Sequence, residues 1–310
     1  MASDGMQIRT NVATQTAHRN AKQVSAAKTN AARRLASGFR VNSAADDPAG
    51  LAIIENMTAQ IRGLDQASNN AQDGMSLVQV AEGSISIVTD SLHRVRELLV
   101  QAANDTYTHI DPGNPAHDDL TSNDRALIEK EIAQMLQSIN TTARNANFNN
   151  MRLFDGTADP TRGGDEIGLQ IGANSGQMMT FSIGEMSTEA LGAQTSFDPA
   201  GTDLIDIILP IADKSGIHVT QLIRYVDEAL DYATEVRAKL GSIQNRLEFT
   251  MSALDNTSIN LVDSRSRIRD ADMAREMMDF TQMNILFQAG MSMIAHGNRT
   301  PENVLRLLQQ

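Results

Sequence analysis

Two histidines and three aspartates in one short stretch are the side chains most able to do chemistry in this chain. They are His109, Asp111, His117, Asp118 and Asp119, and imidazole nitrogens with carboxylate oxygens can bind Zn²⁺ or a similar divalent ion. Prolines and a glycine interrupt the same stretch, and such a loop seldom supplies the outer hydrogen bonds that hold metal ligands in place. A solvated loop without a metal is the favoured interpretation, and a metal site is the alternative.

Two adjacent carboxylates are the second candidate for chemistry. Asp46 and Asp47 could serve as a general acid and base, but they directly precede Pro48. Aspartate followed by proline is typical of a helix start, where the carboxylate caps free N–H groups and proline loses no hydrogen bond. The sequence also lacks the G-x-S-x-G, P-loop and H-E-x-x-H signatures. We expect no catalytic residues, no cofactor and no enzymatic activity.

Sixteen methionines could provide thioether ligands for a soft metal. Met273, Met277, Met283 and Met291 recur at helical spacing. Methionine packs well on a helix face that must fit several neighbours. Packing is therefore the favoured role for these side chains.

The elements that would position these residues are dominated by one long apolar stripe. It runs from about Asp46 to Ala103, with a second set of apolar or small residues three places after most of its members. Two registers held for six heptads indicate one helix that packs lengthwise against partners. The seven-residue stripe comprises Met57, Leu64, Ala71, Val78, Ile85, Leu92 and Leu99.

A second stripe of similar length lies near the other end of the chain. Its heptad positions run from Val219 to Ile268, and Thr250 and Thr257 make the inner positions more polar toward its end. Neither helix covers its stripe alone, so we expect the two to lie side by side. After Ile268 the register shifts to Met273 and Phe280, which predicts a joint where the buried face changes partner.

Smaller elements complete the expected fold. Small residues predict a helix over 6–36, and apolar spacing predicts another over 124–145. Alternating residues between Phe148 and Ile183 predict small β-hairpins, and no fold is assigned to 185–215. The fold class is mainly α: long antiparallel helical rods, like a coiled-coil bundle, with a small β-hairpin region.

Charge is distributed unevenly along the chain. The first 40 residues carry +6 and the last 46 carry +1, which leaves −19 between residues 41 and 264 for a total of −12. The basic start has no aromatic residue before Phe39, so nucleic-acid binding is disfavoured. We expect no membrane span, because apolar runs stay well below the roughly 20 residues that one requires.

LASGFRVNSAADDPAGLAI and QIRGLDQASNNAQDGMSLVQVAEGS are two stretches that resemble the amino-terminal part of bacterial flagellins. FNNMRLFDG and IGLQIGANSGQ look like the segment that caps the flagellin rod. SRIRDADMAREM and IAHGNRTPENVLRLL are similar to the carboxy-terminal signature. The opening MASDGMQIRTN departs from the usual flagellin start, which leaves the packing of residues 1–10 open.

The resemblance implies a structural subunit that assembles itself into the flagellar filament. Its domains would be a core helix over 1–44, a rod with hairpins over 45–184, a connecting segment over 185–215, a rod helix over 216–268 and a second core helix over 269–310. The residues expected in the filament core are Ala17, Val24, Ala31, Leu35, Met273, Met277, Phe280, Phe287, Met291, Ile294, Val304, Leu305 and Leu308.

Other partners also follow from the resemblance. They are an export chaperone and the export apparatus, the filament cap and hook-associated proteins. LHRVRELLVQAAND resembles the segment read by a vertebrate Toll-like receptor, with Arg94, Leu98 and Glu131 as the contacts; simple surface pairing of Arg94 and Glu131 is the alternative. The chain start lacks a secretory signal layout, so we expect a filament outside the cell, exported without signal cleavage, with a periplasmic filament left open.

A hook–filament junction protein is the alternative function. It would share the terminal helices and assemble as a short ring. A cytoplasmic coiled-coil scaffold would explain the apolar stripes but not the joint or the hairpins.

Overall fold

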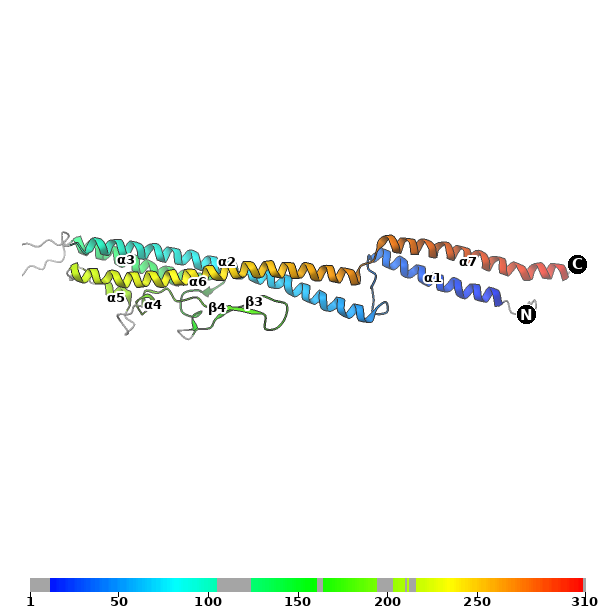
Figure 1. Cartoon of the computed structure of the whole chain (residues 1–310), viewed down its shortest axis with the longest axis horizontal. Coiled ribbons are helices and arrows are strands. Elements are labelled where there is room, and N and C mark those ends of the chain that lie inside the picture. The colour runs from blue at the N-terminus through cyan, green and yellow to red at the C-terminus, as the bar shows by residue number, and fades with distance from the viewer. Residues whose placement is uncertain are drawn as a thin grey trace, which may run out of the picture. The chain divides into compact units, whose positions relative to one another are not determined.

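The contacts of the chain divide it into two compact units. The computed structural model describes residues 12–104, 124–160, 164–193, 203–209, 211 and 216–308. Unit 1 comprises Met1–Ile61 and Ser258–Gln310, and unit 2 comprises Arg62–Thr257. The two longest helices, α2 (Pro48–Ala102) and α6 (Gly216–Arg269), each contribute to both units (Figure 1).

Unit 1 contains an antiparallel pair of terminal helices. α1 (Val12–Ser37) lies beside α7 (Met273–Leu308) (Figure 1). The alanine-rich helix and its pairing with the terminal segment are confirmed over the residues that the structure describes.

The predicted joint between the second stripe and the terminal segment is also confirmed. α6 ends at Arg269, and α7 begins at Met273. Asp272 accepts a hydrogen bond from the N–H of Ala274 at 3.0 Å, as expected of a residue that caps a helix start. The two helices are therefore separate elements.

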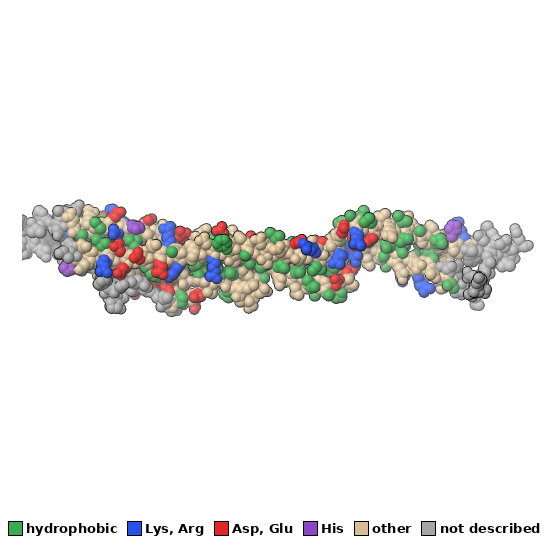
Figure 2. All heavy atoms as spheres, viewed as in Figure 1, with side chains coloured by type: hydrophobic (Ala, Val, Ile, Leu, Met, Phe, Trp, Pro, Cys, Tyr) green, Lys and Arg blue, Asp and Glu red, His purple; other side chains and the backbone are tan. Residues whose placement is uncertain are grey.

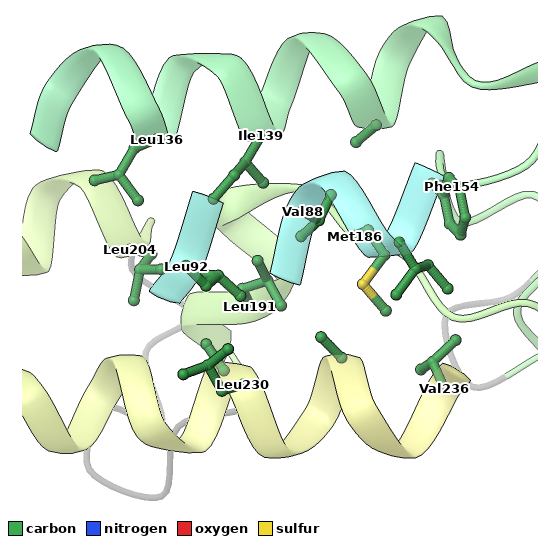
Figure 3. Packing of buried hydrophobic residues seen from close by; sticks show 14 of the residues in the cluster. Val88, Leu92, Leu136, Ile139, Phe154, Met186, Leu191, Leu204, Leu230 and Val236 are labelled. Carbon is green, nitrogen blue, oxygen red and sulfur yellow. The ribbon is translucent and has the colours of Figure 1, made fainter. Parts of the chain in front are cut away.

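Unit 2 contains the core that the two apolar stripes predict. α3 (Asp124–Asn145) packs with α2 and α6, and its bounds match the predicted helix. From α2 the core buries Ala71, Val78, Ile85, Leu92 and Leu99; from α6 it buries Val219, Val226, Ala233, Leu240 and Leu247. Figure 3 shows side chains of α2, α3 and α6 directed toward one another, including Val88, Ile139 and Leu230.

Two antiparallel hairpins lie within unit 2. β1 (Asn147–Phe148) pairs with β2 (Met151–Arg152), and β3 (Ile167–Gln170) pairs with β4 (Met178–Phe181). Asn149 and Asn150 form the first turn with φ of 48° and 65°, a backbone region that asparagine tolerates better than most residues. The hairpin prediction is confirmed.

Two short helices lie in the segment for which the sequence predicted no fold. They are α4 (Thr188–Ala193) and α5 (Leu204–Ile208). Leu191 and Leu204 from these helices are buried in the core, and Figure 3 shows both pointing toward it. The mainly α architecture with a small β region is thus the observed one.

Candidate assembly surfaces

Lys28 joins α1 to α7 inside unit 1. Its ammonium donates to Oδ1 of Asn284 at 2.8 Å, and its Nζ lies 5.8 Å from the ring centre of Phe280 and 5.5 Å from that of Phe287. A lysine between two aromatic rings gains cation–π attraction. Together with the ion pair between Arg34 of α1 and Glu276 of α7 at 3.3 Å, the contact adds charged groups to an interface that also contains small and apolar residues.

The residues predicted for a filament core are not all covered inside the chain. Ala31 is buried, whereas Met273, Met277 and Met291 remain 48%, 53% and 50% exposed. The partly covered members are Ala17, Val24, Leu35, Phe280, Phe287 and Ile294. Val304, Leu305 and Leu308 belong to α7, and their side chains lie outside the part that the structure describes.

α7 is apolar on the side away from α1 as well. Met278 and Ile285 are 65% and 61% exposed, and Figure 2 shows hydrophobic side chains on the surface of this helix. A helix with apolar side chains on more than one face normally packs against more than one partner. One partner helix is therefore too few for α7.

The joint of unit 1 is held by backbone hydrogen bonds. The N–H of Arg40 donates to the carbonyl of Arg269 at 2.7 Å, and the N–H of Ala271 donates to the carbonyl of Gly38 at 2.9 Å. The guanidinium of Arg269 lies 3.8 Å from the ring centre of Phe39. The chain before α2 is thereby tied to the end of α6.

Asp46 and Asp47 have structural roles beside this joint. Oδ2 of Asp46 accepts from the hydroxyl and the N–H of Ser43, both at 3.0 Å, and Oδ1 accepts from Arg33 at 2.9 Å. The Ser43 hydroxyl contributes most to holding the pKa of the Asp46 carboxyl below its ordinary value, and Arg33 adds to the effect. Asp47 caps α2 by accepting from the N–H of Gly50 at 2.9 Å, which agrees with the predicted cap.

The three residues predicted to meet a receptor differ in their accessibility. Arg94 is bound to Glu131 at 2.8 Å and to Glu97 at 3.1 Å, and hydrogen bonding to Glu131 raises the pKa of Arg94 most. Leu98, in contrast, is only 2% exposed. The surface here consists of the Arg94–Glu131 pair, and Leu98 lies beneath it.

The candidates for metal chemistry fall outside what the structure describes. His109, Asp111, His117, Asp118 and Asp119 all belong to the undescribed stretch 105–123. Elsewhere, the described residues contain no cluster of three or more histidine or acidic side chains suited to a metal ion. Among the helices over the described ranges, none is long and apolar enough to cross a bilayer.

Sequence reasoning missed several exposed or buried residues of unit 2. Arg125 is 2% exposed and donates to the carbonyl of Ala102 at 2.8 Å. Phe249 is 77% exposed, and Val80 and Ile87 are 41% and 54% exposed. The heptad register could have revealed these last three, since each lies two residues after a buried stripe position.

The comparisons with known proteins agree with one another. The model of the bacterial flagellin N-terminal helical region matches residues 8–159, and that of the bacterial flagellin C-terminal helical region matches residues 223–308. A flagellin from Halalkalibacterium halodurans is 40% identical over 98% of this chain and 100% of its own length. A Bacillus subtilis flagellin is 40% identical over 89% and 91%, and the flagellin FlaB1 of Treponema pallidum is 37% identical over 89% and 90%.

Proposed function

Since this chain belongs to the bacterial flagellin family and is a structural subunit of the flagellar filament, we propose that α1 and α7 build the filament core. In this proposal residues 1–44 and 269–310 form the core layer. Residues 45–184 and 216–268 form the rod layer around it, and 185–215 connect the two parts of the rod. We expect no catalytic activity from a protein with this role.

The observation that carries the proposal is the exposed apolar surface of α7. Its side chains are exposed on the face away from α1, with Met278 and Ile285 each more than half exposed. Burying a fully exposed side chain of this size contributes about 1.5–3 kcal/mol, and covering the exposed part of Met278 or Ile285 contributes correspondingly less. The last 46 residues carry a net charge of only +1, compared with −19 for residues 41–264, so burying α7 between copies costs less desolvation.

A truncation tests the core role of α7. We expect a chain lacking residues 304–310 to fold in unit 2 with an unchanged melting temperature, because the deletion lies in unit 1. The same chain should fail to polymerise, because the last apolar turns of the core are missing. Electron microscopy and light scattering measure this outcome, and normal filaments from the truncated chain would refute the core role.

Limited proteolysis tests how the ends fold. We propose that residues up to about Phe39 and beyond about Arg269 become ordered only on assembly, since a pair of marginal helices gains stability from additional partners. Cleavage within these ends should then be fast in monomers and slow in filaments. Equal protection in the two states would contradict the proposal.

We also propose where the filament is located and which other proteins bind the chain. Ends that fold late would let a monomer travel through a narrow export channel, so we propose export without signal cleavage to a filament outside the cell. An export chaperone, a cap and hook-associated proteins are the expected partners along this route. Because the family models and the relatives described above are flagellins, electron microscopy should show long filaments rather than the short rings of a hook–filament junction.

Recognition by a vertebrate Toll-like receptor is proposed for the Arg94–Glu131 surface. Arg94 and Glu131 are 49% and 43% exposed at their side chains, so a protein partner can reach both. Arg94→Ala should lower receptor activation by monomers at least tenfold if this pair is a binding hot spot. Arg96→Ala on the same helix is the matched control, and equal activation by both variants would refute the receptor role.

A further inference from the structure

Phe249 is an isolated aromatic side chain on the outer face of α6 in unit 2. It is 77% exposed and lies two residues after Leu247, which is fully buried. Two residues along a helix turn the side chain by about 200°, so Phe249 points away from the core. The side chains of Ser242, Asn245, Arg246, Thr250, Ala253, Leu254 and Thr257 line a groove beside it.

The groove beside Phe249 carries positive charge. Among its lining residues Arg246 is charged, and the others are small, polar or apolar. Aromatic residues and arginine are the types most enriched in the energetic centres of protein interfaces. The composition fits a contact in which Phe249 supplies apolar area and Arg246 supplies charge.

α2 presents a complementary patch on its own outer face. Val80 and Ile87 are 41% and 54% exposed and are one heptad apart, each two residues after a buried stripe position. Asp73 lies one heptad before Val80, and Asp90 lies three residues after Ile87; both are exposed. The patch therefore has two apolar side chains between two carboxylates.

The Phe249 groove and the Val80–Ile87 patch lie on different surfaces of unit 2. α2 and α6 run side by side, joined by Arg96 and Asp227 at 2.6 Å and by Gln244 and Glu82 at 2.9 Å. Both buried stripes belong to one core, so the two outer faces point away from each other. Phe249 cannot reach the patch of its own chain.

We propose that Phe249 of one copy packs between Val80 and Ile87 of a neighbouring copy, with Arg246 beside the carboxylate of Asp90. The opposite charges of the groove and the patch favour a second copy as the occupant. A contact between two different faces of the same chain does not close on itself, so it repeats along a polymer. This inference rests on the proposed filament and names a contact between its rods.

Disulfide trapping tests the contact directly, because the chain has no cysteine of its own. Phe249→Cys and Ile87→Cys chains are mixed in equal amounts, polymerised and treated with a mild oxidant. We expect covalent dimers on a non-reducing gel from the polymerised mixture and far fewer from the unpolymerised one. Phe249→Cys mixed with Val100→Cys is the control, because Val100 is 50% exposed on α2 but belongs to another heptad position.

The outcomes separate this inference from the proposed function. One outcome is that the Phe249→Cys and Ile87→Cys mixture forms normal filaments but gives no more covalent dimer than the Val100→Cys control gives. That result overturns the contact and leaves the filament role intact. Failure of the unmodified chain to form any filament overturns both proposals.

A charge exchange provides a second readout. Phe249→Ala should raise the critical concentration for polymerisation roughly 10- to 100-fold, while unit 2 melts as before because Phe249 is exposed. Arg246→Glu should raise it as well, and adding Asp90→Lys to the same chain should restore part of the loss. An unchanged critical concentration in Phe249→Ala overturns the proposal.

Discussion

Arg125 is a charged side chain whose whole length is buried in unit 2. Its Nε donates to the carbonyl of Ala102, the last residue of α2, at 2.8 Å. The final carbonyls of a helix have no partner within the helix, so the guanidinium satisfies one of them and ties α3 to the end of α2.

Replacing Arg125 should therefore destabilise unit 2. We expect Arg125→Ala to lower the free energy of unfolding by about 2–4 kcal/mol, because it leaves a cavity and removes a charged hydrogen bond from a buried carbonyl. Arg96→Ala, which breaks the exposed pair with Asp227, should cost much less, because exposed ion pairs contribute little to stability. Urea denaturation measures both values, and equal costs would contradict the role given to Arg125.

Asp46 should make unit 1 sensitive to acid. Its folded pKa lies below the ordinary value of about 4, so its stabilising contribution is present above that ordinary value. The contribution disappears as the pH falls through the lower, folded pKa. Asp46→Asn should therefore destabilise unit 1 at pH 7, with a difference from the unmodified chain that shrinks as the pH falls below about 4.

Amide hydrogen exchange at Asn42 and Ser43 measures this effect, because both N–H groups donate to Asp46. Asp47→Asn is the matched control, since asparagine caps a helix as well as aspartate does. A difference between Asp46→Asn and the unmodified chain that stays constant from about pH 7 to about pH 3 would count against the role of the Asp46 charge.

At the level of elements, the β3–β4 hairpin packs on α2 through a glycine. A Cβ added at Gly63 would lie 2.7 Å from Cβ and 3.1 Å from Cα of Ala173, in the loop that joins β3 to β4. Asn70 of α2 also donates to the carbonyl of Gln170 at 3.0 Å. The absence of a side chain at Gly63 is thus what allows this close approach.

Two glycine substitutions in α2 should have different effects. Alanine normally stabilises a helix by about 1 kcal/mol relative to glycine, and Gly83→Ala should show this gain because its new Cβ meets no atom within 4 Å. Gly63→Ala should lose the gain and push the loop at Ala173 away from the helix. Thermal melting and protease cleavage of residues 171–177 measure the two effects; similar gains in both variants would refute the packing argument.

At the level of the whole molecule, charge should control polymerisation. Residues 41–264 carry −19, so copies repel one another at low ionic strength. Raising the salt concentration from about 10 mM to about 150 mM shortens the screening length from roughly 30 Å to roughly 8 Å. The critical concentration should fall over this range in sedimentation assays, whereas the same osmolarity of sucrose should lower it much less; a rise with salt would contradict the charge argument.

Much of the fold could be predicted because a long helix repeats its apolar spacing over many turns. The stripe from Met57 to Leu99 repeats the same apolar spacing many times, so a single exception would not hide it. The short helices α4 and α5 have six and five residues, which is too few for a period to emerge. Their burial depends on the core that α2, α3 and α6 supply.

The exposure of the residues on the candidate surfaces could be predicted less completely than the fold, because local spacing does not show which neighbours cover a side chain. Periodicity identified residues such as Met277 as apolar and helical, but exposure depends on how many neighbours the fold provides. Leu98 illustrates the limit, since its motif pointed to a surface contact whereas it is 2% exposed.

The sequence by itself determined the long helices, the joint after Arg269, the hairpins and the family, because local residue spacing or contiguous motifs are enough to predict each of them. Only the tertiary structure decided that Arg125 is buried, that Asp47 rather than Asp46 caps α2, and that Phe249 and Ile87 face solvent on separate surfaces of unit 2. Burial and pairing arise between residues far apart in the chain, and a local pattern contains no information on which distant neighbour will cover a given side chain.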